Sequence, residues 1–152
     1  MKTLIIYATV TGNTVKVAKA ISKVLKARLV QANKVKIKDI KKYDIIGFGS
    51  GIYFYRHHIS ILKLARKLPS MDKKVFIFST RGAGPGTLYH WSLRRILWKK
   101  GFERIGEFSC KGFDDVGPLK LFGGLNKGRP NKKDVENAKK FAKSLKKLMK
   151  KR

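Results

Sequence analysis

The chain has 152 residues, 43% of them apolar, and carries 37 lysines and arginines against 9 acidic residues. This length suits one domain with a single buried core, so we expect residues 1–152 to form one domain. The one cysteine, Cys110, excludes an internal disulfide and a CxxC site. No apolar run approaches the roughly 18 residues of a membrane span, and we expect a cytoplasmic protein.

The formal net charge of +28 creates a field that attracts anions and speeds association with acidic partners. Nucleic acid, an anionic membrane surface and acidic redox proteins would all respond to it. The basic residues divide almost evenly between the two halves of the chain, and aromatic residues do not interleave with them in a repeating pattern. This distribution favours a solvated surface or a general steering field over a dedicated nucleic-acid site.

The hydrophobic pattern alternates between strands and helices along the chain. Residues 3–8 form an apolar, β-branched run without polar alternation, which is typical of a strand covered on both faces of a parallel sheet. Apolar residues in the segment that follows recur at helical spacing, with lysines on the opposite face. In the same way the pattern predicts further strands at 35–37, 44–50, 74–80 and 104–110, and helices at 13–28, 58–68, 88–100 and after a cap at Asn131.

Five strands alternating with four helices favour an α/β fold with a doubly wound, five-stranded parallel sheet and helices on both faces. Ligands of such sheets bind beyond the carboxyl ends of the strands, where the strand order reverses. The loops that follow the first, third and fourth predicted strands are therefore the candidates for a binding site.

The first strand leads directly into the loop Thr9-Val10-Thr11-Gly12-Asn13-Thr14 and then into a helix. Backbone N–H groups at a helix start carry partial positive charge and suit a phosphate. The threonine hydroxyls and the Asn13 amide add uncharged donors, and Gly12 permits close approach of the backbone. Neither the P-loop pattern GxxxxGK[ST] nor GxGxxG is present.

This loop resembles the phosphate loop of flavodoxins, T-x-T-G-N-T, and matches it at every fixed position. Residues 108–114 and 123–131 also look like the C-terminal half of small flavodoxin-like proteins of anaerobic bacteria and archaea. The resemblance implies the strand order 2-1-3-4-5 and bound flavin mononucleotide (FMN). Typical flavodoxins are strongly acidic, so the charge of this chain departs from the family pattern.

Two further loops complete the flavin site that the resemblance implies. The third strand leads into Ser50-Gly51-Ile52-Tyr53-Phe54, where aromatic rings can stack on a flat heterocycle, although at least one should pack against the next helix. The fourth strand ends in Thr80-Arg81-Gly82, which in flavodoxin-like proteins borders the flavin edge that takes up a proton on reduction. Gly82 is our candidate for a peptide whose hydrogen bonding changes with redox state, and a plain tight turn is the alternative.

Several other residues invite a functional interpretation. His57 and His58 are adjacent and cannot share one helix face as metal ligands, so we expect no metal site and favour solvated or capping roles over proton donation. Cys110 lies in a predicted buried strand and should pack there as a small apolar residue. Trp91 and Trp98 are seven residues apart on one helix face, which we expect to face the core.

We therefore expect an electron carrier with non-covalent FMN that serves an acidic redox partner such as a ferredoxin or a reductase. Its positive surroundings would stabilise the reduced, anionic flavin and raise the low-potential couple relative to acidic relatives. One alternative is an FMN-dependent oxidoreductase of the same fold, of the protoporphyrinogen oxidase or quinone reductase type, which residues 53–58 faintly resemble. The other is a nucleic-acid-binding module without flavin.

Overall fold

Five parallel strands form the central sheet of the structure, a computed structural model that describes residues 1–113 and 124–151. The sheet order is β2-β1-β3-β5-β6, and a two-residue strand, β4, pairs antiparallel with the end of β3. Without β4 this is the predicted order 2-1-3-4-5, so the doubly wound sheet is confirmed. The strands are β1 (Thr3–Ala8), β2 (Arg28–Gln31), β3 (Ile45–Tyr53), β4 (Arg56–His57), β5 (Lys74–Arg81) and β6 (Glu103–Lys111).

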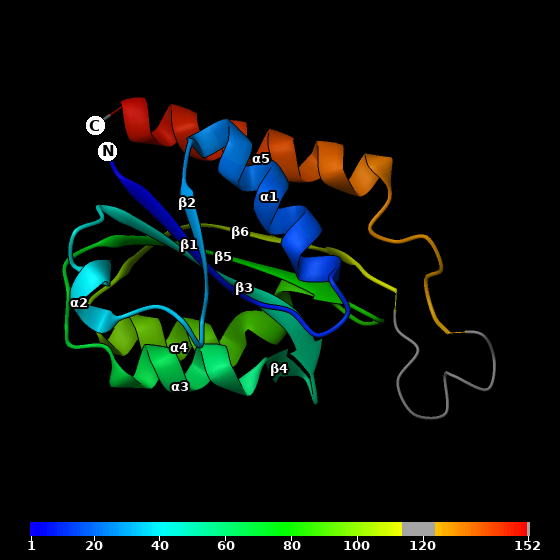
Figure 1. Cartoon of the computed structure of the whole chain (residues 1–152), viewed down its shortest axis with the longest axis horizontal. Coiled ribbons are helices and arrows are strands. Elements are labelled where there is room, and N and C mark those ends of the chain that lie inside the picture. Colours follow the sequence, from blue (N-terminus) through cyan, green and yellow to red (C-terminus); the bar gives the residue numbers. More distant parts are fainter. Residues whose placement is uncertain (114–123, 152) are drawn as a thin grey trace.

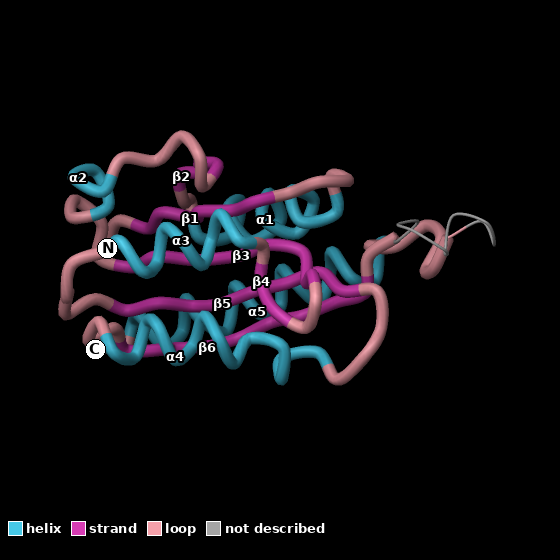
Figure 2. Tube along the Cα trace, turned by 90° about the horizontal axis from the view of Figure 1, so that it is seen from below, coloured by secondary structure: helices cyan, strands magenta, loops and turns pink. Residues whose placement is uncertain are grey.

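Helices cover both faces of the sheet (Figure 1). On one face lie α1 (Asn13–Leu25) and α5 (Lys132–Lys150), and on the other lie α3 (Ile59–Lys67) and α4 (Trp91–Lys99), which Figure 2 shows in front of the strands. A short helix, α2 (Ile37–Ile40), and a 3₁₀ turn, η1 (Gly86–His90), complete the described elements. No helix of residues 1–113 and 124–151 is long and apolar enough to cross a membrane.

The central strands β1, β3 and β5 are buried on both faces, as their continuous apolar sequences predict. The glycines of β3 make room for large side chains from the neighbouring β5. A Cβ atom on Gly47 would lie 2.3 Å from the Phe76 ring, and one on Gly49 would lie 2.2 Å from the Phe78 ring. Gly49 therefore serves core packing against the buried Phe78 ring.

The prediction of a strand at 35–37 was wrong. Helix α1 ends at Leu25 because Lys26 adopts a left-handed φ of 52° and closes the helix, and the second strand follows at once at Arg28–Gln31. Ile5 of β1 pairs with Leu29 of this strand. The segment predicted as a strand instead leads into α2, and its apolar side chains, Val35 and Ile37, pack against the core.

Helix α4 turns its two tryptophans toward solvent, so the expectation that they lie in the core was also wrong. Trp91 is 52% exposed and Trp98 is 75% exposed, whereas Leu93 and Leu97 on the opposite side are buried. The two tryptophans do share one helix face, as their spacing predicted. That face is the one that the sheet does not cover.

Candidate functional site

The loops after β1, β3, β5 and β6 enclose a cavity of about 280 Å³ at the carboxyl edge of the sheet. This position lies where the strand order reverses between β1 and β3, as expected for the fold. Twelve of the fourteen residues predicted for the site line the cavity, together with two that were not predicted. The lining consists of Thr9, Val10, Thr11, Asn13, Thr14, Gly51, Ile52, Tyr53, Phe54, Thr80, Arg81, Gly82, Gly112 and Phe113.

The start of α1 faces the cavity without a side-chain cap. The N-cap residue is Gly12, with a left-handed φ of 87° and no side-chain hydrogen bond to the helix. A Cβ atom on Gly12 would meet nothing within 4 Å, and the Gly12 N–H donates to the Thr9 hydroxyl oxygen at 2.9 Å. Because the first amides of a helix lack intrahelical acceptors, this start can receive an external anion.

A tight hairpin between β3 and β4 forms the second wall of the cavity. Tyr53 pairs with Arg56, which leaves Phe54 and Tyr55 as a two-residue turn with φ values of 49° and 67°. Both central residues are thus left-handed, the signature of a type I′ turn, which Asn-Gly normally occupies. Phe54 is 92% exposed and Tyr55 is 72% exposed. The hairpin therefore projects two large aromatic side chains into solvent in a backbone conformation that disfavours them.

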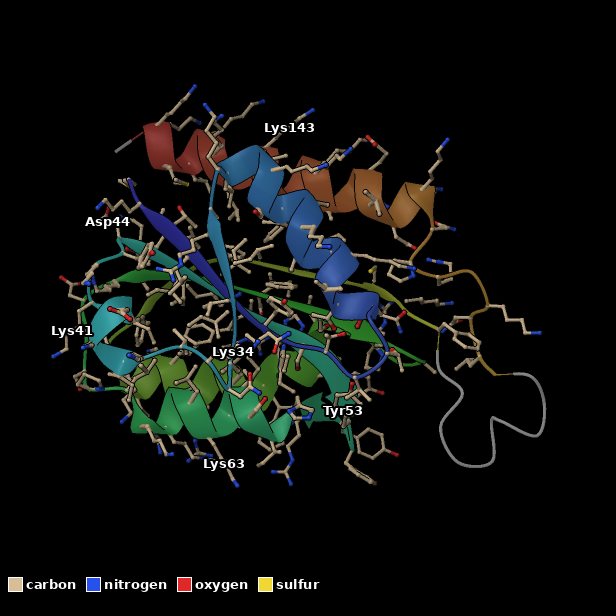
Figure 3. The ribbon with its side chains drawn as sticks, in the orientation of Figure 1. Lys34, Lys41, Asp44, Tyr53, Lys63 and Lys143 are labelled. Carbon is tan, nitrogen blue, oxygen red and sulfur yellow. The ribbon has the colours of Figure 1, made fainter. Side chains whose placement is uncertain are left out.

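Tyr53 lines the cavity at the end of β3, where it is labelled in Figure 3. A Cβ atom on Gly51 would lie 2.7 Å from the Tyr53 hydroxyl oxygen, so a larger residue here would require the Tyr53 side chain to shift. The ring also packs edge-on against His58, with 5.4 Å between the ring centroids. Contact with the next helix was expected of at least one of the three aromatics, and Tyr53 makes it with the residue that caps α3.

Two predicted site residues, Gly12 and Ser50, do not line the cavity. Ser50 is fully buried, donates a hydrogen bond to the Gly51 carbonyl oxygen at 2.7 Å, and accepts one from the His58 N–H at 2.9 Å. These bonds hold the base of the β3–β4 hairpin. In this structure Ser50 thus supports the wall of the cavity from behind.

The end of β5 and the loop after it form the third wall of the cavity, and hydrogen bonds tie this loop and its neighbours together. The Thr14 and Thr80 hydroxyl oxygens lie 3.0 Å apart, and the Asn13 side chain donates to the Phe113 carbonyl oxygen at 2.7 Å. The Asn126 amide donates to the carbonyl oxygens of Gly82 and Gly112. The carbonyl of Gly82, our candidate redox-sensitive peptide, therefore already accepts a hydrogen bond from a side chain 44 residues further along the chain.

Gly112, Phe113 and Asn126 were missed by the sequence analysis. The first two follow β6, whose carboxyl end meets the same edge of the sheet as the other strands, and that position was the available signal. Asn126 belongs to the stretch 123–131 of family resemblance, but nothing there indicated these contacts, because its two acceptors lie 44 and 14 residues away in sequence. Residues 114 and 123, at the ends of the two C-terminal stretches of family resemblance, lie outside the described residues.

A buried polar network lies behind the cavity. The Ser79 hydroxyl and His90 Nε2 are 2.7 Å apart, and His90 Nδ1 lies 3.1 Å from Glu107 Oε1. Arg94 Nη2 contacts both oxygens of Glu107, at 2.9 and 3.2 Å. Burial opposes the charge of Glu107, but the hydrogen bonds from His90 and Arg94 prevail and lower its pKa to about 2. Since Ser79 is fully buried and also bonds Ser109, this serine–histidine–carboxylate chain joins η1, β5 and β6 and offers no exposed nucleophile.

The two adjacent histidines have different environments. His58 caps α3 through Nδ1, which accepts the Ser60 N–H at 3.1 Å, as predicted for a capping role. His57 is buried, contrary to that prediction, and burial lowers its pKa to about 3. Its Nε2 lies 3.1 Å from the Phe78 carbonyl oxygen, and its Nδ1 has no partner among the described residues. Neither histidine reaches the cavity lining.

The single cysteine packs in the core, as predicted. Cys110 is buried, and burial raises the pKa of its thiol to about 12, which keeps it protonated. Within residues 1–113 and 124–151, no group of three or more histidine, cysteine or acidic side chains is placed to hold a metal ion.

Residues 4–96 match the family model described as a flavodoxin domain. The chain is also 50% identical over 147 residues to an uncharacterized protein of Methanocaldococcus jannaschii, a match that covers 95% of this chain and 98% of that protein.

Solved flavodoxins share the fold. Oxidised flavodoxin 2 from Bacillus cereus superposes with a TM-score of 0.76 at 19% identity, over 97% of this chain and 99% of that one. The Fusobacterium nucleatum flavodoxin bound to FMN superposes with a TM-score of 0.69 at 21% identity, over 97% of this chain and 99% of that one. A flavodoxin from the domain Archaea superposes with a TM-score of 0.69 at 16% identity, over 99% of both chains.

Proposed function

The chain belongs to the flavodoxin family, and from that premise we propose that it binds FMN non-covalently in the cavity at the carboxyl edge of the sheet and carries electrons. The observation that carries the proposal is the convergence of an uncapped helix start with two further loops on one cavity. A phosphate suits the first feature, and a flat ring suits the space between the other two.

The residues of the first loop are suited to hold the phosphate. The amides at the start of α1 lack intrahelical acceptors, and the hydroxyls of Thr9 and Thr11 line the same space. The first turn of α1 contains no acidic residue that would repel an anion. A phosphate would therefore find hydrogen-bond donors and the positive end of a helix dipole without any lysine or arginine in the loop.

The ring would lie between the β3–β4 hairpin and the loop after β5. Bound flavin supplies the redox chemistry, and the protein supplies position and electrostatics. Arg81 is the one charged side chain among the described residues of the cavity lining. Its guanidinium is fixed by hydrogen bonds to the Gly84 carbonyl at 3.2 Å and to the Ser109 hydroxyl at 3.1 Å. This fixed cation favours a flavin that becomes anionic on reduction.

We propose an acidic redox protein, of the ferredoxin type, as the partner. The net charge of +28 would steer such a protein toward this one at a rate that falls with ionic strength. The lysines that create the field surround the molecule: in Figure 3, Lys41, Lys63 and Lys143 point outward from three different sides. The field therefore raises the rate of encounter from several sides of the molecule and does not by itself fix the orientation of the partner.

The experiment compares FMN with riboflavin, which lacks the phosphate. We expect the purified protein to bind FMN with a yellow flavin spectrum, and Thr11→Asp to weaken FMN binding about tenfold or more by placing a carboxylate beside the phosphate. Riboflavin binding should not change in Thr11→Asp, and neither affinity should change in the control Lys140→Asp on the outer face of α5. A wild-type protein that refuses FMN, or an equal loss for both flavins, contradicts the proposal.

A second measurement addresses the use of the electrons. Reduced, FMN-loaded protein should pass electrons to an acidic ferredoxin or accept them from it, without turning over protoporphyrinogen or a quinone. Turnover of either substrate would identify an FMN-dependent oxidoreductase instead, an assignment that the matches to flavodoxins do not favour.

A further inference from the structure

A group of large side chains projects into solvent from α4 and from the turns that precede it. We call this group the aromatic face, and it consists of Phe54, Tyr55, Leu88, Trp91, Arg95 and Trp98. Its apolar members are between 52% and 92% exposed. Contiguous exposed apolar surface of this kind marks interaction sites in soluble proteins.

The aromatic face is continuous from the rim of the cavity to the far end of α4. Phe54 lines the cavity, and its neighbour Tyr55 accepts a hydrogen bond from Trp91 Nε1 at 3.3 Å through its carbonyl oxygen. Trp91, Arg95 and Trp98 then follow at helical spacing along one side of α4. A partner seated on α4 would therefore also cover the hairpin at the edge of the proposed flavin site.

The fold does not require these side chains to be apolar. Leu93 and Leu97 on the inner side of α4 supply its contribution to the core. In the hairpin, Phe54 and Tyr55 hold left-handed backbone conformations, which cost free energy in residues with large side chains. Strain of this kind persists at functional sites, so the exposed aromatics point to an external contact.

Basic side chains predominate around the aromatic face. Residues 45–102 contain a single acidic residue, Asp72, whereas α4 alone carries Arg94, Arg95 and Lys99. Tryptophan, tyrosine and arginine are the residues enriched among the energetic anchors of protein interfaces. An acidic protein surface with exposed apolar groups would complement this combination.

The shape of the surface favours a protein over a bilayer. Between α4 and the beginning of β6 lies an open groove of about 650 Å³, which Trp91 and Trp98 border above an apolar floor that includes Phe102. A protruding loop or terminus of a protein can fill such a groove, whereas a flat lipid surface cannot. Arg95 also borders the groove and suits an acidic residue in that segment. Arg94 and Arg104 border the groove too but are paired with Glu107, and Glu103 adds one acidic side chain to the lining.

We propose that the aromatic face is the docking site of an acidic ferredoxin-type partner, which inserts a segment into the groove of α4 and covers the hairpin beside the flavin cavity. The inference rests on the proposed electron-carrier function for the identity of the partner. The aromatic residues supply the orientation that the general positive field cannot supply.

The chain offers a direct probe, because its two tryptophans both belong to the aromatic face. The FMN-loaded protein is titrated with an acidic, tryptophan-free [4Fe–4S] ferredoxin while tryptophan emission is followed and corrected for absorption. We expect saturable quenching. Trp98→Ala should weaken ferredoxin binding about tenfold, with Trp91 emission as the remaining signal and FMN affinity unchanged.

A matched pair of double variants separates docking from general attraction. Arg95→Glu with Lys99→Glu reverses two exposed charges one helical turn apart on α4, and Lys19→Glu with Lys23→Glu makes the same change on the outer side of α1. We expect the α4 pair to weaken ferredoxin binding at least tenfold more than the α1 pair at moderate salt. Equal weakening by the two pairs, or unchanged binding in Trp98→Ala, overturns the proposal.

Three further outcomes are decisive. If the α4 variants lose binding to phosphatidylglycerol vesicles and keep ferredoxin binding, the aromatic face contacts membranes and the proposal is wrong. A protein that binds FMN but no ferredoxin overturns this inference and leaves FMN binding intact. A protein that binds ferredoxin through the aromatic face but refuses FMN overturns the proposed function and leaves the docking site.

Discussion

The turn between β3 and β4 offers a prediction in which stability and function oppose each other. Phe54 and Tyr55 occupy the two left-handed positions of this turn, where Asn-Gly is normally found. We expect the double variant Phe54→Asn with Tyr55→Gly to be more stable than the wild type and to bind its ligands less well. The left-handed conformation costs about 1–2 kcal/mol per non-glycine residue, so the variant relieves about 2–4 kcal/mol of strain.

Two effects reduce this gain. Glycine increases the conformational entropy of the unfolded chain and costs about 1 kcal/mol. The contact between the Tyr55 and Tyr89 rings, with centroids 5.8 Å apart, is also lost. Little burial is lost otherwise, because Phe54 is 92% exposed and Tyr55 is 72% exposed. The net stabilisation should therefore be about 1–2 kcal/mol.

Guanidinium denaturation of the FMN-free protein measures this change. The transition midpoint should rise while the slope m stays constant, because the surface exposed on unfolding hardly changes. In parallel, FMN and ferredoxin affinities should fall. A variant that is less stable than the wild type would refute the reasoning, since the aromatic pair would then stabilise the fold. Increased stability with unchanged binding would show that the strain serves no contact.

Three further predictions concern residues behind the cavity. Burial lowers the pKa of His57 to about 3, so between about pH 6.5 and pH 3 the unfolded chain binds more protons than the folded protein. The free energy of unfolding should therefore decrease by up to about 1.4 kcal/mol for each unit by which the pH is lowered in this range. His57→Leu should reduce this slope in denaturation curves recorded at several pH values. Glu107→Gln should cost about 1–3 kcal/mol in thermal unfolding, because Arg94 loses its charged partner. Asn126→Ala releases the Gly82 carbonyl, and the midpoint potential of bound FMN should shift upward because the peptide can then reorient when the flavin is reduced.

Controls make each result specific. Glu136→Gln removes an exposed pair with Lys139 on α5 and should change stability by less than about 1 kcal/mol. Asn137→Ala, on the exposed side of the same helix, should leave the midpoint potential unchanged. An unchanged pH slope in His57→Leu would mean that His57 is not the group that opposes folding in acid. An unchanged potential in Asn126→Ala would mean that the Gly82 peptide stays fixed in both redox states.

The predictions from sequence succeeded where the signal was local. The central strands are continuous apolar runs, and the loop from Thr9 to Thr14 joins one of them directly to an amphipathic helix. The error at the second strand arose because Lys26 ends α1 in a left-handed conformation that is usually taken by glycine. A lysine gives no such warning, and Arg28 continued the basic pattern of the helix into the strand.

The parts that could not be predicted depend on distant residues. Ser79, His90 and Glu107 come from β5, η1 and β6, and their proximity follows only from the sheet order and the connection between them. The position of Asn126 beside Gly82 likewise depends on the return of the chain after β6. The tryptophans of α4 were assigned to the wrong side because hydrophobic spacing identifies a face without saying what covers it.

The charge and the aromatic face have separable physical effects. Lysines on several sides of the molecule raise the rate at which acidic partners arrive, and this effect weakens when salt shortens the Debye length to about 8 Å at physiological ionic strength. Contacts of Trp91 and Trp98 in a groove depend on packing and persist under the same screening. The two effects therefore predict different salt responses for association and dissociation. Added salt should slow association of ferredoxin with the wild type and with Trp98→Ala by the same factor, whereas the faster dissociation from Trp98→Ala should remain at every salt concentration.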